Sequence, residues 1–335
     1  MTIKDIARLS GVGVSTVSRV LNDRPDVSEA SRRRVLAVIA EHNYLPNNSA
    51  RSLVCTKSDA VGLVVRGVQN PFYTGIIRAI EDRLDAAGCT MVMRQIRSGD
   101  DEIKCGAVME REKRLQGIIF LGGRSDYSPA DLALLNVPFV CCSYTNSYGT
   151  LDPAAYSSVS IADEEEAYRA VMELYKKGHT KIAALTADPA DRSISQLRYR
   201  GYARALREIG QTHEDLICTE DFTIESAYAA TRARLERGAD FTALFSIADN
   251  MAIGAMRALR ESGRSLPEDC SVIAIDGLTV SEYIHPMLTT LCQPVEDMGT
   301  KSVDILLSLL NGGEHRHLTF PTTLRAGQSV RELTR

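Results

Sequence analysis

After residue 59 the sequence alternates short apolar runs with longer amphipathic stretches, and this alternation constrains the fold more than any other feature. Seven apolar runs have the composition of buried strands: 60–65, 90–95, 117–121, 138–142, 181–185, 242–246 and 271–275. Seven stretches with helical spacing of apolar residues lie among them: 73–88, 101–115, 163–178, 195–210, 225–238, 249–262 and 294–311. Such alternation predicts doubly wound α/β sheets of parallel strands. The length allows two such units with a seam near residue 160, and ligands of this fold bind at the carboxyl ends of strands.

The first 46 residues carry a different pattern, that of three short helices. The expected helices span residues 4–10, 14–22 and, with Ser28 as the capping residue, about 29–43. Thr2 and Asp5 have the spacing of a capping box at the start of the first helix. Gly11 supplies the backbone freedom that a tight turn between the first two helices needs. Three short helices joined in this way predict a helix-turn-helix, which is a DNA-binding motif.

The second expected helix has two unlike faces. Its apolar face joins a shared core made of Ile6, Ala7, Val12, Val17, Val20 and Leu21. Its other face carries Ser15, Ser18, Arg19 and Asn22 at helical spacing, and each of these side chains can donate a hydrogen bond. A three-helix core without a ligand would explain the apolar residues but not the polar face. We therefore interpret this face as one that reads base edges, with Arg19 as the reader of guanine.

The charge and composition fit a DNA-binding head on a soluble body. Residues 1–59 hold nine basic and six acidic residues, a net charge of +3, which leaves −7 for the remainder because the whole chain carries −4. The sequence has no apolar run long enough to span a membrane and no apolar core of a signal peptide, so we expect a cytoplasmic protein. Its eight cysteines show no metal-ligand spacing and read as buried thiols. We expect no metal, no other cofactor and no membrane partner.

Residues 2–22, TIKDIARLSGVGVSTVSRVLN, resemble the headpiece of the LacI/GalR family of bacterial repressors. The likeness continues through Tyr44–Asn47 and Ala50–Leu53, and then through VGLVV, NPFY, GHTKIA, PEDCSVIAIDG and PMLTTLCQP. It implies a transcriptional repressor that binds a palindromic double-stranded DNA operator as a homodimer, under the control of a small-molecule effector. The residues that it implies for DNA binding are Thr2, Val14, Ser15, Thr16, Ser18, Arg19, Asn22, Tyr44, Arg51 and Leu53.

The resemblance also implies the domain organisation. Residues 1–46 would form the headpiece, and 47–58 the hinge helix and linker. A helix of two turns is marginal alone in water, so the hinge would fold against its dimer mate in the minor groove, where Leu53 would wedge between base pairs. A plain interdomain linker is the alternative. Residues 59–335 would form a sensor like a periplasmic binding protein, with lobe 1 at about 59–160 and 292–320 and lobe 2 at about 161–291 and 321–335.

Seven residues match positions that contact the effector in the family: Phe72, Tyr73, Asp163, Arg198, Phe222, Asp249 and Asp276. Their chemistry suits a polar ligand, because carboxylates accept hydrogen bonds from hydroxyls, arginine donates in a fork and aromatic rings cover apolar sugar faces. Five residues depart from the family pattern: Ser143, Glu164, Ala248, Gly277 and Gly327. We expect a sugar or sugar derivative as effector, and these departures leave a nucleobase or nucleoside as the alternative.

Two other classes of protein share parts of this pattern. A solute-binding protein for transport has the same two-lobed fold, but the signal peptide is missing and a DNA-reading head is present. An α/β enzyme could use Asp249 or Asp276 as a base, but no Ser-His-Asp, Cys-His or phosphate-loop pattern accompanies them. The sequence therefore predicts a regulator without catalytic residues, and it does not indicate whether the effector induces or corepresses.

Overall fold

The computed structural model describes residues 1–21, 24, 26–42, 59–67, 70–97, 99–188, 192–211 and 215–333. The chain divides into two compact units, residues 1–58 and 59–335. The first is helical and the second contains two sheets, as the sequence predicts.

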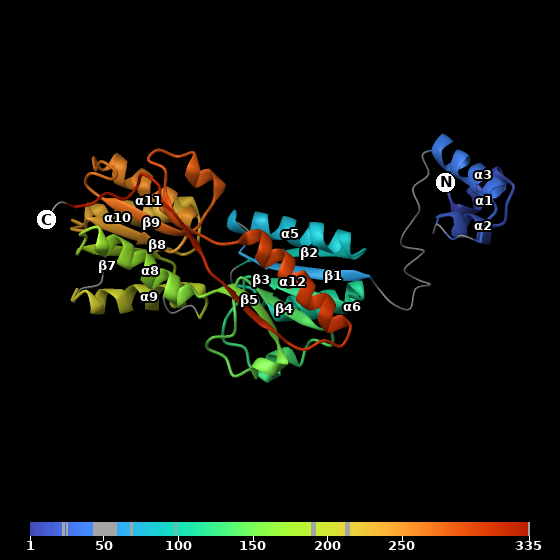
Figure 1. Ribbon diagram of the computed structural model, residues 1–335, viewed down its shortest axis with the longest axis horizontal. Helices are drawn as coiled ribbons and strands as arrows, with labels where there is room; N and C mark the ends of the chain where they lie inside the picture. The colour runs from blue at the N-terminus through green and yellow to red at the C-terminus, as the bar shows by residue number, and fades with distance from the viewer. Residues whose placement is uncertain are drawn as a thin grey trace. The chain divides into compact units, whose positions relative to one another are not determined.

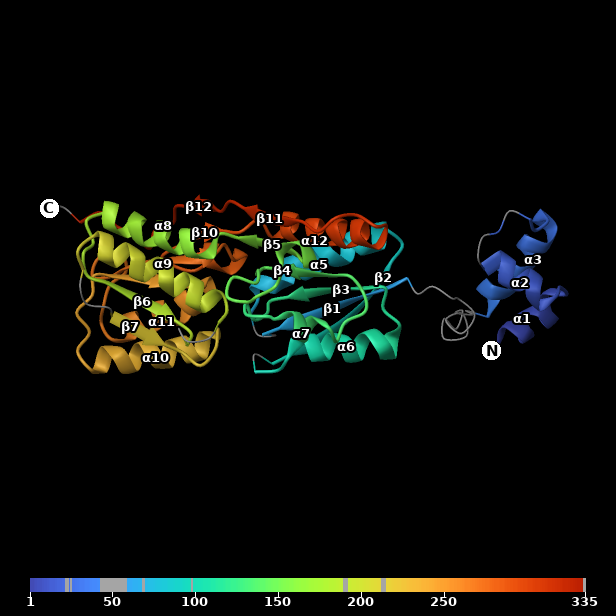
Figure 2. The same cartoon turned by 90° about the horizontal axis from the view of Figure 1, so that it is seen from below.

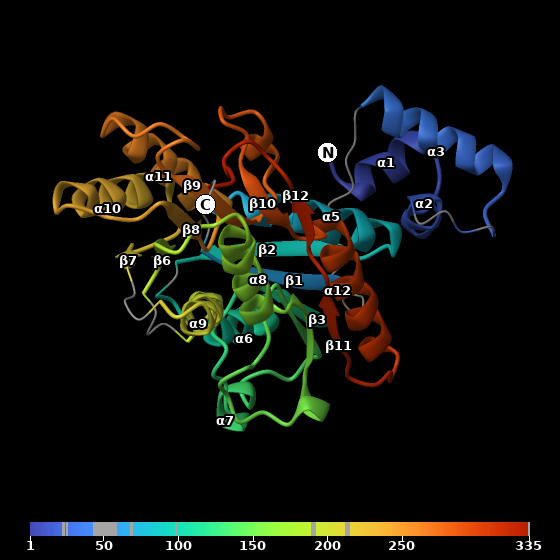
Figure 3. The ribbon, with the colours of Figure 1, turned by 60° about the vertical axis from the view of Figure 1, so that its left-hand side comes forward.

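Three helices make up the described part of the first unit (Figure 3): α1 Ile3–Ser10, α2 Val14–Leu21 and α3 Glu29–Glu41. Thr2 and Asp5 form both halves of the expected capping box. Gly11 has a φ of 66°, and its N–H donates to the carbonyl of Ala7, which ends α1. The predicted turn is therefore confirmed, while α3 ends at Glu41 rather than near residue 43.

The core of the first unit is small and comes from all three helices. It consists of Ile6, Ala7, Val17, Val20 and Val35. Val12 and Leu21 are partly buried against it. Helices of eight residues are not stable alone in water, so the packing of these side chains holds α2 in place and leaves its opposite face for a partner.

The first sheet of the second unit has the order β11-β5-β4-β3-β1-β2. Its strands are β1 Ala60–Arg66, β2 Thr90–Ile96, β3 Gly117–Leu121, β4 Phe139–Cys142, β5 Ser157–Ile161 and β11 His317–Phe320. All of its neighbouring strands pair in parallel. Its helices are α5 Phe72–Ala86, α6 Glu102–Lys113, the short α7 Pro129–Leu132 and α12 Val295–Leu310, with a 3₁₀ turn, η1, at Pro153–Ala155. Figure 2 shows α5 and α12 on one face of this sheet and α6 on the other. We call this part lobe 1.

The second sheet has the order β12-β10-β9-β8-β6-β7. Its strands are β6 Ile182–Thr186, β7 Asp215–Cys218, β8 Ala243–Ser246, β9 Ser271–Asp276, β10 Thr289–Cys292 and β12 Thr323–Arg325, the last antiparallel to β10. Its helices are α8 Asp163–Lys176, α9 Ile194–Glu208, α10 Ile224–Glu236 and α11 Asp249–Glu261, with a 3₁₀ turn, η2, at Thr279–Glu282. In Figure 1, α10 and α11 lie on one side of the sheet, and α8 and α9 on the other. We call this part lobe 2.

The seven predicted strands correspond to β1, β2, β3, β4, β6, β8 and β9. The prediction omitted five short strands: β5, β7, β10, β11 and β12. Three of these, β7, β11 and β12, are edge strands of three or four residues, too short to carry a periodic pattern. β5 is buried throughout, yet three of its five residues are serines, so its burial comes from the neighbouring strands and not from its own hydrophobicity.

The chain passes between the lobes after β5, after β10 and after β11. These connections set the carboxyl ends of the parallel strands of the two sheets toward a shared cleft, where α/β folds bind ligands. In the part of the chain that the structure describes, no helix has both the length and the apolar character needed to cross a membrane. Over the same residues, no three His, Cys, Asp or Glu side chains gather as a metal site would require.

Candidate nucleic-acid interface and ligand cavity

The polar face of α2 lies on the surface of the first unit. Ser15 and Arg19 are exposed, and Thr16 and Ser18 are partly buried. Val14, at the start of the helix, has 42% of its surface exposed, and Thr2, beside α1, is also exposed. The expected sites at Asn22, Tyr44, Arg51 and Leu53, together with the hinge segment 47–58, lie outside the described residues. The described members of the set are thus accessible to a partner.

The ion pair that Arg19 makes within the described residues is weak. Arg19 Nη1 lies 3.3 Å from Asp26 Oδ2, and both side chains are more than half exposed. Ion pairs this exposed contribute about 0–1 kcal/mol to stability. Because the pair costs so little to break, the guanidinium can turn to a guanine edge or a phosphate.

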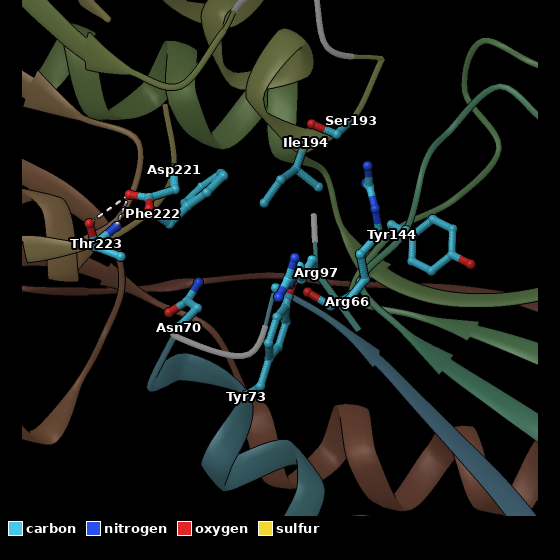
Figure 4. A pocket seen from close by; sticks show the side chains of 14 residues that line it. Arg66, Asn70, Tyr73, Arg97, Tyr144, Ser193, Ile194, Asp221, Phe222 and Thr223 are labelled. Carbon is cyan, nitrogen blue, oxygen red and sulfur yellow. Dashed lines mark hydrogen bonds between the residues drawn. The ribbon is translucent and has the colours of Figure 1, made fainter. Parts of the chain in front are cut away.

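A cavity of about 360 Å³ lies between the two lobes of the second unit (Figure 4). Its volume is within the range of small-molecule sites. It is lined by Arg66, Gly67, Asn70, Tyr73, Arg97, Gly122, Gly123, Ser143, Tyr144, Ser193, Ile194, Asp221, Phe222 and Thr223. Figure 4 shows Phe222 and Ile194 of lobe 2 on one side and Asn70 and Tyr73 of lobe 1 on the other. A ligand in this cavity would contact both lobes.

Two glycines let aromatic side chains approach the strand ends in lobe 1. A Cβ on Gly122 would lie 2.5 Å from the Tyr73 hydroxyl, and one on Gly123 would lie 2.5 Å from the Tyr144 ring. Burial raises the pKa of Tyr73 well above its ordinary value, and the charge of Asp276 adds to the effect. Tyr73 therefore presents a neutral hydroxyl that can donate a hydrogen bond.

Arg198, Asp163 and Asp276 form a buried charged cluster in lobe 2. Arg198 Nε donates to Asp163 Oδ1 at 2.8 Å, and its Nη1 donates to Asp276 Oδ1 at 3.3 Å and to the carbonyl of Ile247. Gln293 Nε2 also donates to Asp276 Oδ1 at 2.9 Å. One guanidinium faces two carboxylates, so when both are ionised the cluster carries a net negative charge.

Asp276 is the least satisfied member of this cluster. Its Oδ2 has no hydrogen-bond partner, and neither has Gln293 Oε1. Burial raises the pKa of Asp276 to about 7, although the charge of Arg198 opposes the rise. Asp276 also has a φ of 144°, a strained conformation for a residue with a side chain. Strain and unpaired polar atoms of this kind concentrate at functional sites.

The structure brings only part of the expected effector set to the cavity. Tyr73 and Phe222 line it, while Phe72 packs in the core of lobe 1 with 5% of its surface exposed. Asp249 accepts hydrogen bonds from Leu278 N–H and Ser281 Oγ, both at 2.8 Å, and from Thr290 Oγ1. Those bonds tie α11 to the segment after β9. The roles of Asp163, Arg198 and Asp276 toward a ligand stay predictions.

Several lining residues were not expected from the sequence: Arg66, Asn70, Arg97, Ser193, Asp221 and Thr223. A signal for two of them was present, because Arg66 and Arg97 follow predicted strands almost directly. Asp221 and Thr223 belong to the cap of α10, where a polar residue is expected for structural reasons alone. Their position at the cavity follows only from the arrangement of the lobes.

Comparison with known proteins gives two family matches and many relatives. Residues 2–47 match the model of bacterial regulatory proteins of the lacI family, and residues 171–330 match that of a periplasmic binding protein-like domain. The chain is 38% identical to the HTH-type transcriptional regulator MalR of Clostridium butyricum over 97% of both chains. It is 31% identical to the ribose operon repressor of Escherichia coli, covering 91% of this chain and 92% of that protein.

Two solved structures extend the comparison to the whole fold. The complex of the transcriptional regulator CelR with cellobiose has a TM-score of 0.71 at 31% identity, covering 98% of this chain and 99% of that one. The lac repressor dimer bound to operator and the anti-inducer ONPF has a TM-score of 0.79 at 27% identity, covering 99% of both chains.

Proposed function

Because the chain belongs to the LacI family of bacterial regulatory proteins, we propose that it is a repressor that binds a palindromic operator as a homodimer and responds to a small-molecule effector. Members of the family are transcriptional regulators and not enzymes. The observation that carries the proposal is the exposed polar face of α2 on a compact three-helix unit. The cytoplasmic location expected from the sequence belongs to the same proposal, since a bacterial regulator meets the chromosome there.

The proposed DNA contacts are of two kinds: some read the base sequence and others position the protein on the duplex. Arg19 would donate in a fork to a guanine, while Ser15, Thr16 and Ser18 would contact bases or phosphates beside it. Thr2 and Val14 would lie against the backbone of the duplex. The remaining proposed contacts, Asn22, Tyr44, Arg51 and Leu53, rest on the family resemblance alone. Leu53 would wedge between base pairs from a hinge helix within residues 47–58.

Exposed apolar side chains of the second unit support a homodimer. Tyr283 has 83% of its surface exposed and Val280 50%, both on or beside η2. Met93, on the edge strand β2, has 44% exposed. Apolar side chains and an open sheet edge at the surface are features that a protein partner covers. A second copy of the chain is the partner that a palindromic operator requires.

The cavity supports a polyhydroxylated effector. Tyr73 and Phe222 offer aromatic faces, and Asn70, Ser143 and Ser193 offer polar groups around them. This combination suits a sugar, which has apolar ring faces and hydroxyl edges. The CelR structure holds cellobiose, which agrees with a sugar here.

Contacts beside the cavity join the two lobes. These contacts would change if a bound ligand altered the arrangement of the lobes. Ser125 N–H of lobe 1 donates to the carbonyl of Arg192 of lobe 2 at 2.8 Å. The Arg200 guanidinium stands 5.8 Å from the centre of the Tyr148 ring. Arg192 directly precedes Ser193, which lines the cavity. A ligand that binds one arrangement of the lobes better than another shifts the equilibrium between them, and we propose that this shift controls operator affinity.

Selection of DNA by the full-length protein tests the DNA-binding part of the proposal. Rounds of binding to a random duplex pool should enrich a sequence with two-fold symmetry. At constant salt, Arg19→Ala should then lower affinity for that sequence by about 1–3 kcal/mol and relax discrimination at one position. Leu53→Ala should also weaken binding.

A matched control separates base reading from general electrostatics. Arg33→Ala removes the same charge from an exposed position on α3, so it should weaken all sequences about equally. If neither Arg19→Ala nor Leu53→Ala changes operator affinity at fixed salt, the proposal fails.

A dye-reported thermal-shift screen tests the effector part. The panel contains sugars, sugar phosphates, nucleobases and nucleosides. A ligand at a hundred times its dissociation constant stabilises its site by about 2.7 kcal/mol. Phe222→Ala should reduce the response to a sugar, and a response confined to nucleobases or nucleosides would replace the sugar by the alternative effector class.

A further inference from the structure

The cavity of the second unit has an excess of positive charge on its lobe 1 side. Arg66 and Arg97 both line it, and Asp221 is the one carboxylate among the described residues that do so. Arg66 ends β1 and pairs in register with Ile96 of β2, so Arg97 follows directly on the neighbouring strand. The two arginines therefore stand at adjacent carboxyl ends of strands in the same sheet.

Within the described residues, the guanidinium groups of Arg66 and Arg97 are only loosely paired with carboxylates. The ion partner of Arg66 is Glu102, whose Oε2 lies 3.7 Å from Arg66 Nε, and this Nε makes no hydrogen bond. The other oxygen of Glu102 already accepts from Arg124 N–H and from the Tyr127 hydroxyl. Within the described part of the chain, Arg97 has no recorded ion pair. Both guanidinium groups thus keep donors for a ligand.

One oxygen of the carboxylate at the cavity is held by the protein. Asp221 Oδ1 accepts from Thr223 N–H at 2.9 Å, from Thr223 Oγ1 at 2.6 Å and from Ser226 Oγ at 2.5 Å. These bonds hold the start of α10. Asp221 Oδ1 therefore caps a helix on the lobe 2 side of the cavity.

Helix N-termini add to the positive potential of the cavity. The lining residues Ser193 and Thr223 are the N-caps of α9 and α10, and Asn70 lies two residues before the start of α5. These three helices are 13 to 15 residues long. Each helix start carries a partial positive charge and N–H groups that bind anions. The starts of α5 and α9 act in the same sense as the two arginines, while the Asp221 carboxylate offsets the start of α10.

We propose that the effector carries an anionic group, a phosphate ester or a carboxylate, which Arg66 and Arg97 hold in the lobe 1 wall of the cavity. The inference rests on the proposed function, because it names the chemistry of the ligand that the regulator senses. The polyhydroxyl part of that ligand lies against Tyr73 and Phe222. A free neutral sugar would leave Arg97 without an ion partner among the described residues, and Arg66 with only its 3.7 Å contact to Glu102. An anionic group would supply charge-assisted hydrogen bonds to both, and these are strong in a partly enclosed site.

Calorimetric titration of the full-length protein with matched ligands tests the inference. The probes are glucose, glucose 6-phosphate and gluconate, then ribose and ribose 5-phosphate, and inorganic phosphate alone. In at least one series the anionic member binds about tenfold or more tightly than its neutral parent, and the gain shrinks with added salt. Comparison of the phosphate ester with the sugar acid identifies the anion.

Two variants that each remove one positive charge, one inside the cavity and one outside it, test where the anionic group binds. Arg97→Gln should abolish the preference for the anionic ligand over its neutral parent. Arg94→Gln removes the same charge from an exposed position on the same strand, outside the cavity, and should leave the preference intact. Because the Arg66 side chain packs beside the buried Glu102, Arg66→Lys is used instead of a neutral variant and should lower the preference.

Three results would overturn the inference: equal or tighter binding of the neutral sugars, an anion preference that survives Arg97→Gln, or no binding of any anionic probe, inorganic phosphate included. Failure of the proposed function would look different. It would appear as absence of sequence-specific DNA binding by the unsubstituted protein, whatever ligands the second unit binds.

Discussion

The buried carboxyl of Asp276 makes the second unit less stable as the pH rises. The pKa of this group is about 7 in the folded protein, against 3.8 for an ordinary aspartate, because burial disfavours its charge. Between these two values the folded protein holds a proton that the unfolded chain has lost. The stabilisation is therefore fully present below pH 3.8 and is lost as the pH rises through 7. At about 1.4 kcal/mol per pH unit, the loss amounts to about 4 kcal/mol.

Asp276→Asn tests this reasoning with a side chain of the same shape. Its amide oxygen can still accept from Arg198 and Gln293, which both donate to Asp276 Oδ1. The variant carries no charge to bury, so at pH 8 it should be more stable than the unchanged protein by up to about 4 kcal/mol. At pH 5 the difference should fall to about 2 kcal/mol, because there the native Asp276 is largely protonated.

Urea unfolding at pH 5 and pH 8, without ligand, measures the difference. Tyrosine emission is the signal, because the chain has no tryptophan and eleven of its twelve tyrosines follow residue 58. Asp240→Asn is the control, since Asp240 is an exposed partner of Lys181 and its loss should have little effect. If Asp276→Asn is less stable than the native protein at pH 8, or if the difference does not depend on pH, the reasoning is wrong.

Three further predictions concern other parts of the molecule. Gly11→Ala should destabilise the first unit by about 1 kcal/mol, because Gly11 has a φ of 66°. Thermal unfolding followed by circular dichroism measures this loss of stability. In the same experiment Gly13→Ala, where a new Cβ would meet no atom closer than 3.6 Å, should lower the stability less. Arg198→Met should destabilise the second unit by about 3–5 kcal/mol in urea at pH 8, since it leaves two buried carboxylates without their cation. Equal stability of the variant would contradict a stabilising role for the charged cluster. Tyr283→Asp should shift the proposed dimer toward monomer in sedimentation experiments, and a dimer of unchanged stability would exclude η2 from its interface.

Local sequence signals predicted the first unit well. The spacing of Thr2 and Asp5 indicated a capping box, and both of its hydrogen bonds are present. Gly11 indicated the turn because few other residues tolerate its backbone conformation. These features depend on neighbours within a few residues, so they can be recognised without knowledge of the fold.

Features that depend on distant residues were not predictable in the same way. β5 is a serine-rich strand that becomes buried only between β4 and β11. Arg97 reaches the cavity because β1 and β2 pair in the register that places Ile96 beside Arg66. Asp249, whose contact with a ligand stays a prediction, accepts hydrogen bonds from three donors in the segment after β9 and in β10. In each case the decisive contact joins parts of the chain that are far apart in sequence.

The central claim is that ligand binding in the second unit changes DNA binding by the first. Fluorescence anisotropy tests this claim. The selected operator is titrated with the full-length protein at constant salt, once without ligand and once with the sugar or sugar phosphate that stabilises the protein most. The account predicts that saturating ligand changes the operator dissociation constant by about 5- to 150-fold in either direction. A bound ligand that leaves the operator dissociation constant unchanged would contradict it.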